Sequence, residues 1–175
     1  MSLSCNALAP AWLCAHRDVL LYLAPSLALA LLIRTLSRRI ALFHVFTLAG
    51  TICHELAHFV IGLLTGARPA SFTVIPRRSG KGWELGSVVL TRLRWYNAAP
   101  TALAPLLIIA IPLAVGVWRT QPGWRFESSD ILLAFLLAPQ FLSCWPSAVD
   151  WKVASHSWPV AALALLAWGA HLMWP

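Results

Sequence analysis

Long apolar runs, separated by short polar or basic stretches, make up most of the chain. A transmembrane α-helix needs about 20 consecutive, mainly apolar residues to cross a hydrocarbon core about 30 Å thick. Several runs approach or reach this length, so the pattern predicts an all-α membrane protein with about five transmembrane helices. The predicted spans cover residues 19–33, 40–64, 98–117, 131–145 and 160–174.

The stretch between the second and third runs follows a different pattern. Residues 71–75 and 86–91 contain several β-branched side chains, and a basic stretch with proline and glycine, residues 76–82, separates them. Two such runs around turn-forming residues predict a β-hairpin. We therefore expect a short hairpin over residues 71–91, directly after the second helix, within one membrane domain that covers residues 1–175.

Pro139 lies near the end of the fourth run. Irregular backbone at membrane depth is tolerated only where it is buried in protein or lines a cavity. The sequence therefore predicts that Pro139 interrupts the fourth helix, and that this interruption lies beside a functional cavity.

The composition indicates lipid as the surrounding medium. Hydrophobic residues make up 59% of the chain and charged residues 11%, whereas an average soluble domain carries about a quarter charged residues. Most of the tryptophans lie near the ends of apolar runs, which is typical of the aromatic belts at membrane interfaces. The N-terminal residues lack the pattern of a secretory signal, so we expect a multi-pass protein of a bacterial inner membrane that keeps its whole chain.

The net charge of +7 could indicate a nucleic-acid partner. However, the basic side chains lie in the connections between apolar runs and not along one helical face, so we expect no nucleic acid to bind. Alternating threading through a membrane puts Arg17 on the side of the hairpin, and Arg119 and Arg125 on the other side. More basic residues fall on the hairpin side, which favours a cytoplasmic hairpin.

The second run contains the residues best suited to chemistry. His54 and His58 are four positions apart, so a helix brings them to the same face, one turn apart. Two neutral imidazoles suit Zn²⁺, and a catalytic site needs a third protein ligand and a free position for water. Glu55 can then act as a general base toward that water. A chance HExxH sequence is the alternative, but three ionisable side chains within an apolar run are costly unless they are functional.

Asp150 is the predicted third ligand. It follows Pro146, beyond the end of the fourth run, and alternating threading puts it on the same side as the hairpin. The alternative is that Asp150 pairs with Lys152 or caps the helix that follows. His156 is the substitute ligand if Asp150 does not bind the metal.

These residues together resemble the site-2 protease family of intramembrane zinc metalloproteases. The resemblance covers residues 40–151 and consists of the HExxH sequence in a hydrophobic helix, a β-prone hairpin and a distant aspartate after a proline. Pro146 and Asp150 stand where the family usually has an Asn-Pro…Asp-Gly pattern, and Trp151 replaces the glycine.

The resemblance implies a zinc-dependent endopeptidase, with Glu55 as the catalytic residue and His54, His58 and Asp150 as zinc ligands. Its substrate would be a transmembrane or membrane-proximal polypeptide, held extended along the hairpin edge. Two alternatives stay open: a membrane metal transporter, and a non-catalytic zinc-binding membrane protein that sequesters a partner helix. Glu55 favours the protease over both alternatives, because hydrolysis needs a general base beside the metal ligands, whereas transport and structural zinc binding do not.

Overall fold

The computed structural model describes residues 16–37, 46–75, 77–79 and 82–173. These residues are mainly helical with a small antiparallel sheet, which confirms the predicted helical class and the hairpin. The helical segments are α2 (Arg17–Ser37), α3 (Leu48–Leu64), α4 (Ala98–Ala102), η2 (Ala104–Ile109), α5 (Ala110–Arg119), α6 (Ser128–Ser143), α7 (Ala148–Ala154), η3 (Ser155–Ser157) and α8 (Trp158–Met173). The strands are β1 (Pro69–Thr73), β2 (Arg77–Ser79), β3 (Gly82–Glu84) and β4 (Ser87–Leu90).

The lengths of the described helices do not support five transmembrane spans. By length and composition, α2 alone could cross a membrane, and α6 with the helical segment after it could form a second span that is bent by 52°. The other apolar helices are shorter. One reason is that residues 40–45 of the second predicted span lie outside the described residues, so that α3 is described only from Leu48.

The third predicted span, residues 98–117, forms three consecutive helical segments instead of one helix. α4 ends at Ala102, and Leu103 separates it from η2, which leads into α5. Pro105 stands at the start of η2. A proline has no N–H and clashes with the preceding helical turn, so it is tolerated mainly in the first turn of a helix. The helix therefore restarts here, beside α3.

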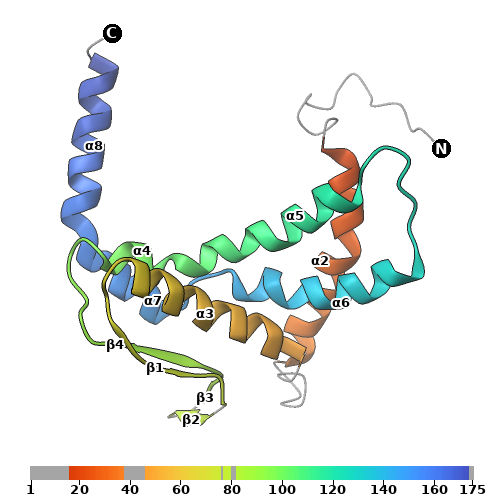
Figure 1. The fold of residues 1–175 in the computed structure, drawn as a ribbon, viewed down its shortest axis with the longest axis horizontal. Helices are drawn as coiled ribbons and strands as arrows, with labels where there is room; N and C mark the ends of the chain where they lie inside the picture. The colour runs from red at the N-terminus through yellow and green to blue at the C-terminus, as the bar shows by residue number, and fades with distance from the viewer. Residues whose placement is uncertain (1–15, 38–45, 76, 80–81, 174–175) are drawn as a thin grey trace.

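The predicted hairpin forms an antiparallel pair of strands that lies over α3. β1 and β4 pair with Phe72 opposite Val88, and β2 and β3 form a second antiparallel pair beyond them. The strands β1 and β4 lie alongside α3 (Figure 1), and Gly86, just before β4, lies against this helix. A Cβ atom at Gly86 would lie 2.7 Å from Cγ of Glu55 and 3.1 Å from Cγ2 of Thr51. Only glycine allows the strand to approach the helix this closely.

α3 and α6 cross in direct contact at Gly50. A Cβ atom there would lie 2.9 Å from the carbonyl carbon of Pro139 and would overlap the Pro139 carbonyl oxygen and Ser143 Oγ. The prediction that Pro139 interrupts the fourth helix is wrong, because α6 continues through Pro139 to Ser143. Pro139 is buried in this crossing, and packing against α3 stabilises the helix despite the missing hydrogen bond. The break follows at residues 144–147.

The start of α2 lies beside the end of α5 and the start of α6 (Figure 1). The Tyr22 hydroxyl donates to Asp130 Oδ1 at 3.1 Å, and Val19 lies against Gly116, where an added Cβ would be 3.0 Å from Val19 Cγ1. The start of α2 therefore lies at the end of the molecule opposite to the strands (Figure 1). Apolar packing of α2 along α6 stabilises this arrangement.

α8 covers the fifth predicted span and projects away from the other helices (Figure 1). Its apolar side chains are exposed around the helix, with Leu165 at 73% and Leu166 at 71% exposure. Residue 174 of that predicted span lies outside the described residues.

Candidate metal centre

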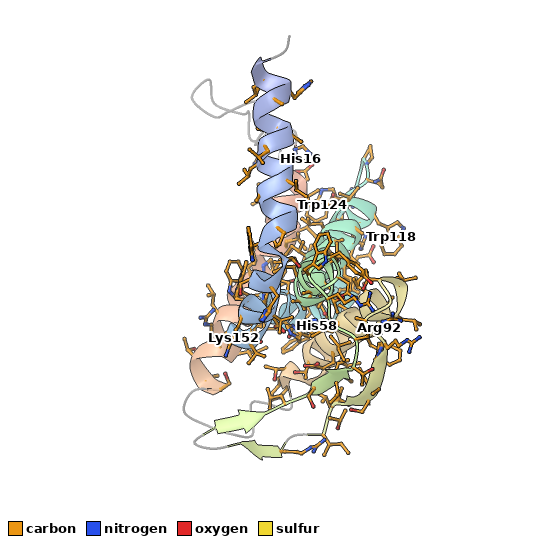
Figure 2. The ribbon with its side chains drawn as sticks, turned by 90° about the vertical axis from the view of Figure 1, so that its left-hand side faces the viewer. His16, His58, Arg92, Trp118, Trp124 and Lys152 are labelled. Carbon is orange, nitrogen blue, oxygen red and sulfur yellow. The ribbon has the colours of Figure 1, made fainter. Side chains whose placement is uncertain are left out.

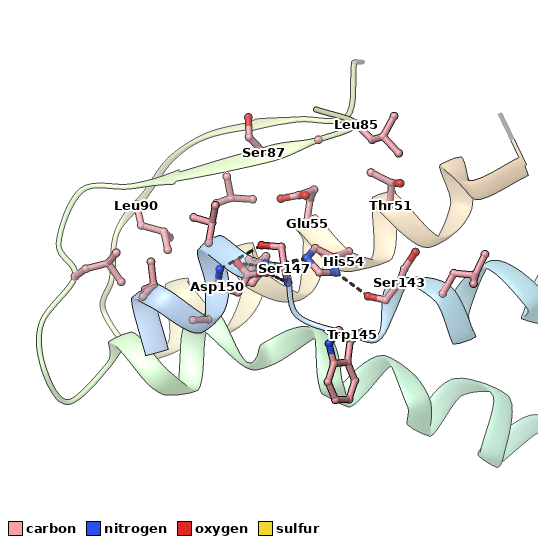
Figure 3. Close-up of a pocket in the computed structure, with 18 residues that line it drawn as sticks. Thr51, His54, Glu55, Leu85, Ser87, Leu90, Ser143, Trp145, Ser147 and Asp150 are labelled. Carbon is pink, nitrogen blue, oxygen red and sulfur yellow. Dashed lines mark hydrogen bonds and ion pairs between the residues drawn. The ribbon is translucent and has the colours of Figure 1, made fainter. Parts of the chain in front are cut away.

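The three side chains that the sequence selects as metal ligands meet in space. α3 carries His54 and His58, α7 carries Asp150, and one ligand atom from each lies within 4.8 Å of the others. The Nε2 atom of His58 lies 3.2 Å from Nε2 of His54 and 3.2 Å from Oδ1 of Asp150. The Nε2 atom of His54 lies 3.5 Å from Oδ2 of Asp150 (Figure 3). This group could hold a metal ion.

The second ring nitrogen of each histidine contacts a backbone carbonyl. His54 Nδ1 lies 2.7 Å from the carbonyl oxygen of Ser143, and His58 Nδ1 lies 2.8 Å from that of Thr101. A carbonyl oxygen only accepts hydrogen bonds, so each Nδ1 must carry a proton and donate it. In a neutral imidazole the Nε2 atom then keeps its lone pair, which is the form that binds a metal ion.

Breaks in the helices make both carbonyls available to the histidines. In a continuous α-helix the Thr101 carbonyl would accept from the N–H of residue 105, but Pro105 has no N–H. The Ser143 carbonyl lies at the end of α6, and the N–H that would reach it in a longer helix, that of Ser147, donates to Asp150 Oδ2 at 2.6 Å. Each carbonyl therefore lacks its i+4 helical partner. The Thr101 oxygen also accepts from a backbone N–H at the end of α4, and its second lone pair serves His58.

The facing atoms of the cluster could hold a cation between them. Two Nε2 lone pairs and an ionised carboxylate converge at 3.2–3.5 Å, and no donor is left among them unless a proton charges one imidazole. Tetrahedral Zn²⁺ with bonds of about 2.0–2.1 Å separates its ligand atoms by about 3.3–3.4 Å. The donor set and the spacing of His54, His58 and Asp150 therefore fit such an ion.

Asp150 is held in place by the start of α7. Its backbone N–H donates to Ser147 Oγ at 3.2 Å, and its Oδ2 accepts from the Ser147 N–H, which together form a capping box. The carboxylate thus caps a helix, as the alternative interpretation expected, and at the same time faces both histidines. The two roles are compatible because a carboxylate has two oxygen atoms and several lone pairs.

Glu55 lies on α3 between the two histidines in sequence and is buried, with an exposed fraction of 9%. Figure 3 shows its side chain projecting into the space between α3 and the strand above it. The Gly86 position lies directly over its Cγ atom. Glu55 and the metal ligands line the same cavity, so its carboxylate is placed to act on a molecule bound beside the cluster.

The cavity over the cluster has a volume of about 770 Å³. α3 forms its floor, and the segment from Leu85 to Leu90 forms the wall on the sheet side. The break between α6 and α7 closes another side, where Trp145 is exposed and lies 6.1 Å from Trp151 between ring centroids. Most of the lining surface is apolar, and Thr51, Ser87, Ser143 and Ser147 add a few polar groups to those of the cluster. A mainly apolar cavity with a few convergent polar groups is typical of a binding site.

His156, the substitute ligand, does not belong to the cluster. It is exposed, and its Nδ1 lies 3.0 Å from the carbonyl oxygen of Lys152, four residues earlier, in α7. Within the described part of the chain, the ion pairs of Asp150 are with the two histidines and not with Lys152. The structure thus places Asp150, and not His156, beside the two histidines of α3.

The sequence does not predict that the carbonyls of Thr101 and Ser143 accept from the histidines, or that Gly86 lies over Glu55. Thr101 and Ser143 act through backbone atoms, which every residue has, so their side chains carry no signal of this role. Pro105, four residues after Thr101, is the one usable signal, because it shows that the Thr101 carbonyl lacks its helical partner. Gly86 could have been singled out only as a glycine within a β-prone run.

Known proteins offer no direct guide to the function of this chain. No family model, no curated protein and no solved structure matches it. What the chain does must therefore be inferred from the chemistry of His54, Glu55, His58 and Asp150 and from the surfaces around them.

Proposed function

We propose that this chain is an intramembrane zinc metalloprotease, similar to site-2 proteases, that cleaves a peptide bond in or near a transmembrane segment. The observation that carries the proposal is the convergence of His54, His58 and Asp150 at ligand spacing, with Glu55 lining the same cavity. A His₂-carboxylate set with an adjacent glutamate is the arrangement that zinc hydrolases use.

Zinc is the metal that this donor set favours. Two imidazole nitrogens and one carboxylate oxygen are typical ligands of a catalytic zinc ion, whereas Mg²⁺ and Ca²⁺ prefer sites made of oxygen atoms. When bound, the ion would polarise the peptide carbonyl and lower the pKa of water in the site. His54, His58 and Asp150 would occupy three positions and leave the fourth open toward the cavity.

Glu55 would act as the general base and then as the general acid. Its carboxylate accepts a proton from the water that attacks the peptide carbonyl carbon, and returns the proton to the departing amine as the C–N bond breaks. Burial between α3 and the strand segment excludes bulk water from this carboxylate. The proton therefore passes between Glu55 and the reacting groups with little exchange with solvent.

The strand β4 would hold the substrate in an extended conformation. β1 pairs with β4 along one edge, and among the described strands none pairs along the other. Val88 and its neighbours line the cavity over the cluster. A helical substrate has its carbonyls in internal hydrogen bonds, so it must unwind before hydrolysis, and pairing with a strand edge would stabilise the unwound form.

The membrane setting of the proposal rests on the exposed apolar surface. α2 exposes Leu31 at 64%, and α8 exposes Leu163, Leu165 and Leu166 at 62–73%. Soluble monomers rarely expose large contiguous apolar patches, whereas lipid would cover such surfaces. We propose that the five apolar segments lie in the membrane, the shorter helices included.

Zinc content and peptide cleavage together test the proposal. Purified wild-type protein in detergent should contain about one zinc ion per chain, and His54→Ala and Asp150→Ala should lose it. Glu55→Gln should keep the zinc but cleave none of a panel of transmembrane peptides that the wild type cleaves. His156→Ala is the matched control and should keep both properties. Absence of zinc from wild type after zinc reconstitution, or cleavage by Glu55→Gln, would contradict the proposal.

The role of β4 has a separate test. Val88→Pro removes an N–H from the strand and should reduce cleavage of the same peptides while zinc content stays at the wild-type level. Ala70→Pro, at the irregular point between Pro69 and Ser71 in β1, is the control and should retain more activity. Wild-type cleavage by Val88→Pro would show that the strand edge does not hold the substrate.

A further inference from the structure

The loop from Thr91 to Asn97, which connects β4 to α4, is organised by a fully buried amide. Asn97 has an exposed fraction of 0%, and its Oδ1 accepts from the Arg94 N–H at 2.7 Å. Its Nδ2 group donates to the carbonyl of Arg92 at 3.1 Å and lies 3.4 Å from that of Thr65, at the end of α3. The buried Asn97 side chain therefore holds the loop against the end of α3.

This loop presents arginine side chains on its outer surface. Arg92 and Arg94 are exposed, and Figure 2 shows Arg92 at the periphery of the molecule, on the opposite side of the view from Lys152. Arg68 is also exposed and is adjacent in space, since the Arg92 N–H donates to the Ala67 carbonyl at 2.9 Å. Arg68 has a φ of 54°, an uncommon backbone conformation for a non-glycine residue.

The three arginines have no carboxylate partner within the described part of the chain. The ion pairs there involve His54, His58 and Arg119 with acidic residues, and none involves Arg68, Arg92 or Arg94. The backbone around Arg68 is hydrogen-bonded to that of Thr91 and Arg92, so three positively charged residues belong to one short part of the fold. The surface therefore has the charge for an external anionic ligand.

Apolar and aromatic side chains border the arginines. Trp95 and Tyr96 are 53% and 45% exposed, and their rings form an edge-to-face pair with centroids 5.8 Å apart. On the other side, the end of α3 exposes Leu63 at 63% and Leu64 at 75%, a few residues before Arg68. Tryptophan and tyrosine beside basic residues and apolar helix surface are typical of the membrane interface.

We propose that Arg68, Arg92 and Arg94, with Trp95 and Tyr96, form a binding surface for the headgroup of an anionic phospholipid. Guanidinium groups bind phosphate oxygens in a bidentate manner, and the exposed leucines at the end of α3 would contact the acyl chains. A nucleic acid or an acidic protein would supply the negative charge but not the apolar chains beside it. This inference does not depend on peptide hydrolysis.

The lipid surface and the metal centre share the same loop. Leu93, between Arg92 and Arg94, lines the cavity over the cluster and is itself 40% exposed. The two arginines on either side of it are exposed too. A lipid bound to the outer side would therefore fix one wall of the cavity. It would also hold the cavity at the level of the lipid headgroups.

Native mass spectrometry of the full chain in neutral detergent tests the proposal. Phosphatidylglycerol and phosphatidylcholine with the same acyl chains are titrated separately, and the wild type should retain phosphatidylglycerol at much lower concentration. A basic residue near an anionic headgroup contributes about fivefold in affinity, so Arg92→Gln/Arg94→Gln should bind phosphatidylglycerol about 30-fold more weakly. Raising the salt concentration should weaken binding to the wild type in the same direction.

The matched control is Arg34→Gln/Arg125→Gln, which removes two exposed arginines outside this surface and should leave phosphatidylglycerol binding unchanged. Circular dichroism and zinc content of both double variants should equal those of the wild type, since none of these side chains contacts the cluster. Equal retention of the two lipids, equal loss in both double variants, or binding that salt does not weaken would overturn the proposal. Displacement of the lipid by inorganic phosphate under conditions where sodium chloride of equal ionic strength does not displace it would also overturn the proposal, because the surface would then recognise a free anion.

Discussion

Each histidine of the cluster is oriented by the nitrogen that does not face the cluster. His54 and His58 donate through Nδ1 to the carbonyls of Ser143 and Thr101, which fixes both the tautomer and the plane of each ring. Metal-binding histidines held in this way stay oriented without the ion. The site is therefore organised before a metal ion enters, and binding does not have to order these side chains.

The capping box of α7 gives a prediction at the scale of one residue. Ser147→Ala removes the hydroxyl that accepts from the Asp150 N–H, which costs about 1 kcal/mol of helix stability and leaves the carboxylate less restrained. Loss of a group that orients a ligand lowers metal affinity about 10–100-fold, so we expect zinc affinity to fall at least about tenfold. Competition with a fluorescent zinc chelator measures this change.

Ser155→Ala is the control for this experiment. The Ser155 hydroxyl donates to the Lys152 carbonyl near the other end of the same helix, and it touches none of the three ligands. Zinc affinity should stay at the wild-type value. Equal affinities in Ser147→Ala and Ser155→Ala would mean that the capping box does not position Asp150.

Breaks between helices, more than the helices themselves, build the site. Pro105 ends the α-helical hydrogen bonding beside Thr101, and the end of α6 exposes the Ser143 carbonyl. Each break turns a backbone acceptor toward α3, where a histidine uses it. Continuous helices at either position would satisfy these carbonyls internally.

Replacing the proline tests this role. Pro105→Ala supplies an N–H that can bond to the Thr101 carbonyl and compete with His58 Nδ1. We expect zinc affinity to fall several-fold, by the mechanism that applies to other groups orienting metal ligands. Pro112→Ala is the control, since Pro112 is equally buried but lies in α5. If the two variants bind zinc equally, the proline does not keep the carbonyl available.

The crossing of α3 and α6 gives a second prediction for the helices. Gly50→Ala would place a Cβ atom against the Pro139 carbonyl group, and overpacking of this kind costs about 1–3 kcal/mol. The melting temperature in detergent, followed by circular dichroism, should fall. Gly169→Ala, on the projecting helix α8, meets no atom within 4 Å and should leave the melting temperature unchanged or slightly higher. A wild-type melting temperature in Gly50→Ala would contradict the close packing.

Local patterns in the sequence predict much of this architecture. The apolar runs locate α2, α6 and α8, and β-branched residues locate the hairpin, because hydrophobic patterning acts over a few neighbouring residues. The spacing of His54 and His58 predicts their common face for the same reason. The prediction of Asp150 as the third ligand rests only on its place in the chain, which is weaker evidence than the spacing of the two histidines. The direction of α2 and the crossing at Gly50 depend on contacts between distant segments, which no local pattern encodes.

The molecule carries a second polar cluster at the end opposite to the hairpin. Asp130 is 2% exposed. It accepts a hydrogen bond from the Tyr22 hydroxyl of α2 at 3.1 Å and two from the Arg119 guanidinium of α5, at 2.8 Å and 3.1 Å. Its own helix adds the Glu127 N–H at 2.7 Å. One carboxylate thus links α6 to its neighbour α5 and to α2, which is far from both in the sequence, so it stabilises the arrangement of these helices.

We expect Asp130→Asn to melt at a lower temperature than the wild type, because the charge at the centre of the cluster is gone. Asp18→Asn, which removes an exposed carboxylate, should melt at the wild-type temperature. Equal melting temperatures for the wild type and Asp130→Asn would show that this carboxylate does not stabilise the arrangement of the helices.

The wide separation of the metal ligands along the chain also sets the order in which activity can arise during synthesis. Roughly 90 residues lie between His58 and Asp150, and a ribosome that adds about 5–20 residues per second needs about 5–20 s to make them. A nascent chain that ends before α7 carries the two histidines and Glu55 but lacks the third ligand. Such a fragment could not hydrolyse neighbouring membrane proteins, so the proposed activity would begin only when almost the whole chain has been made.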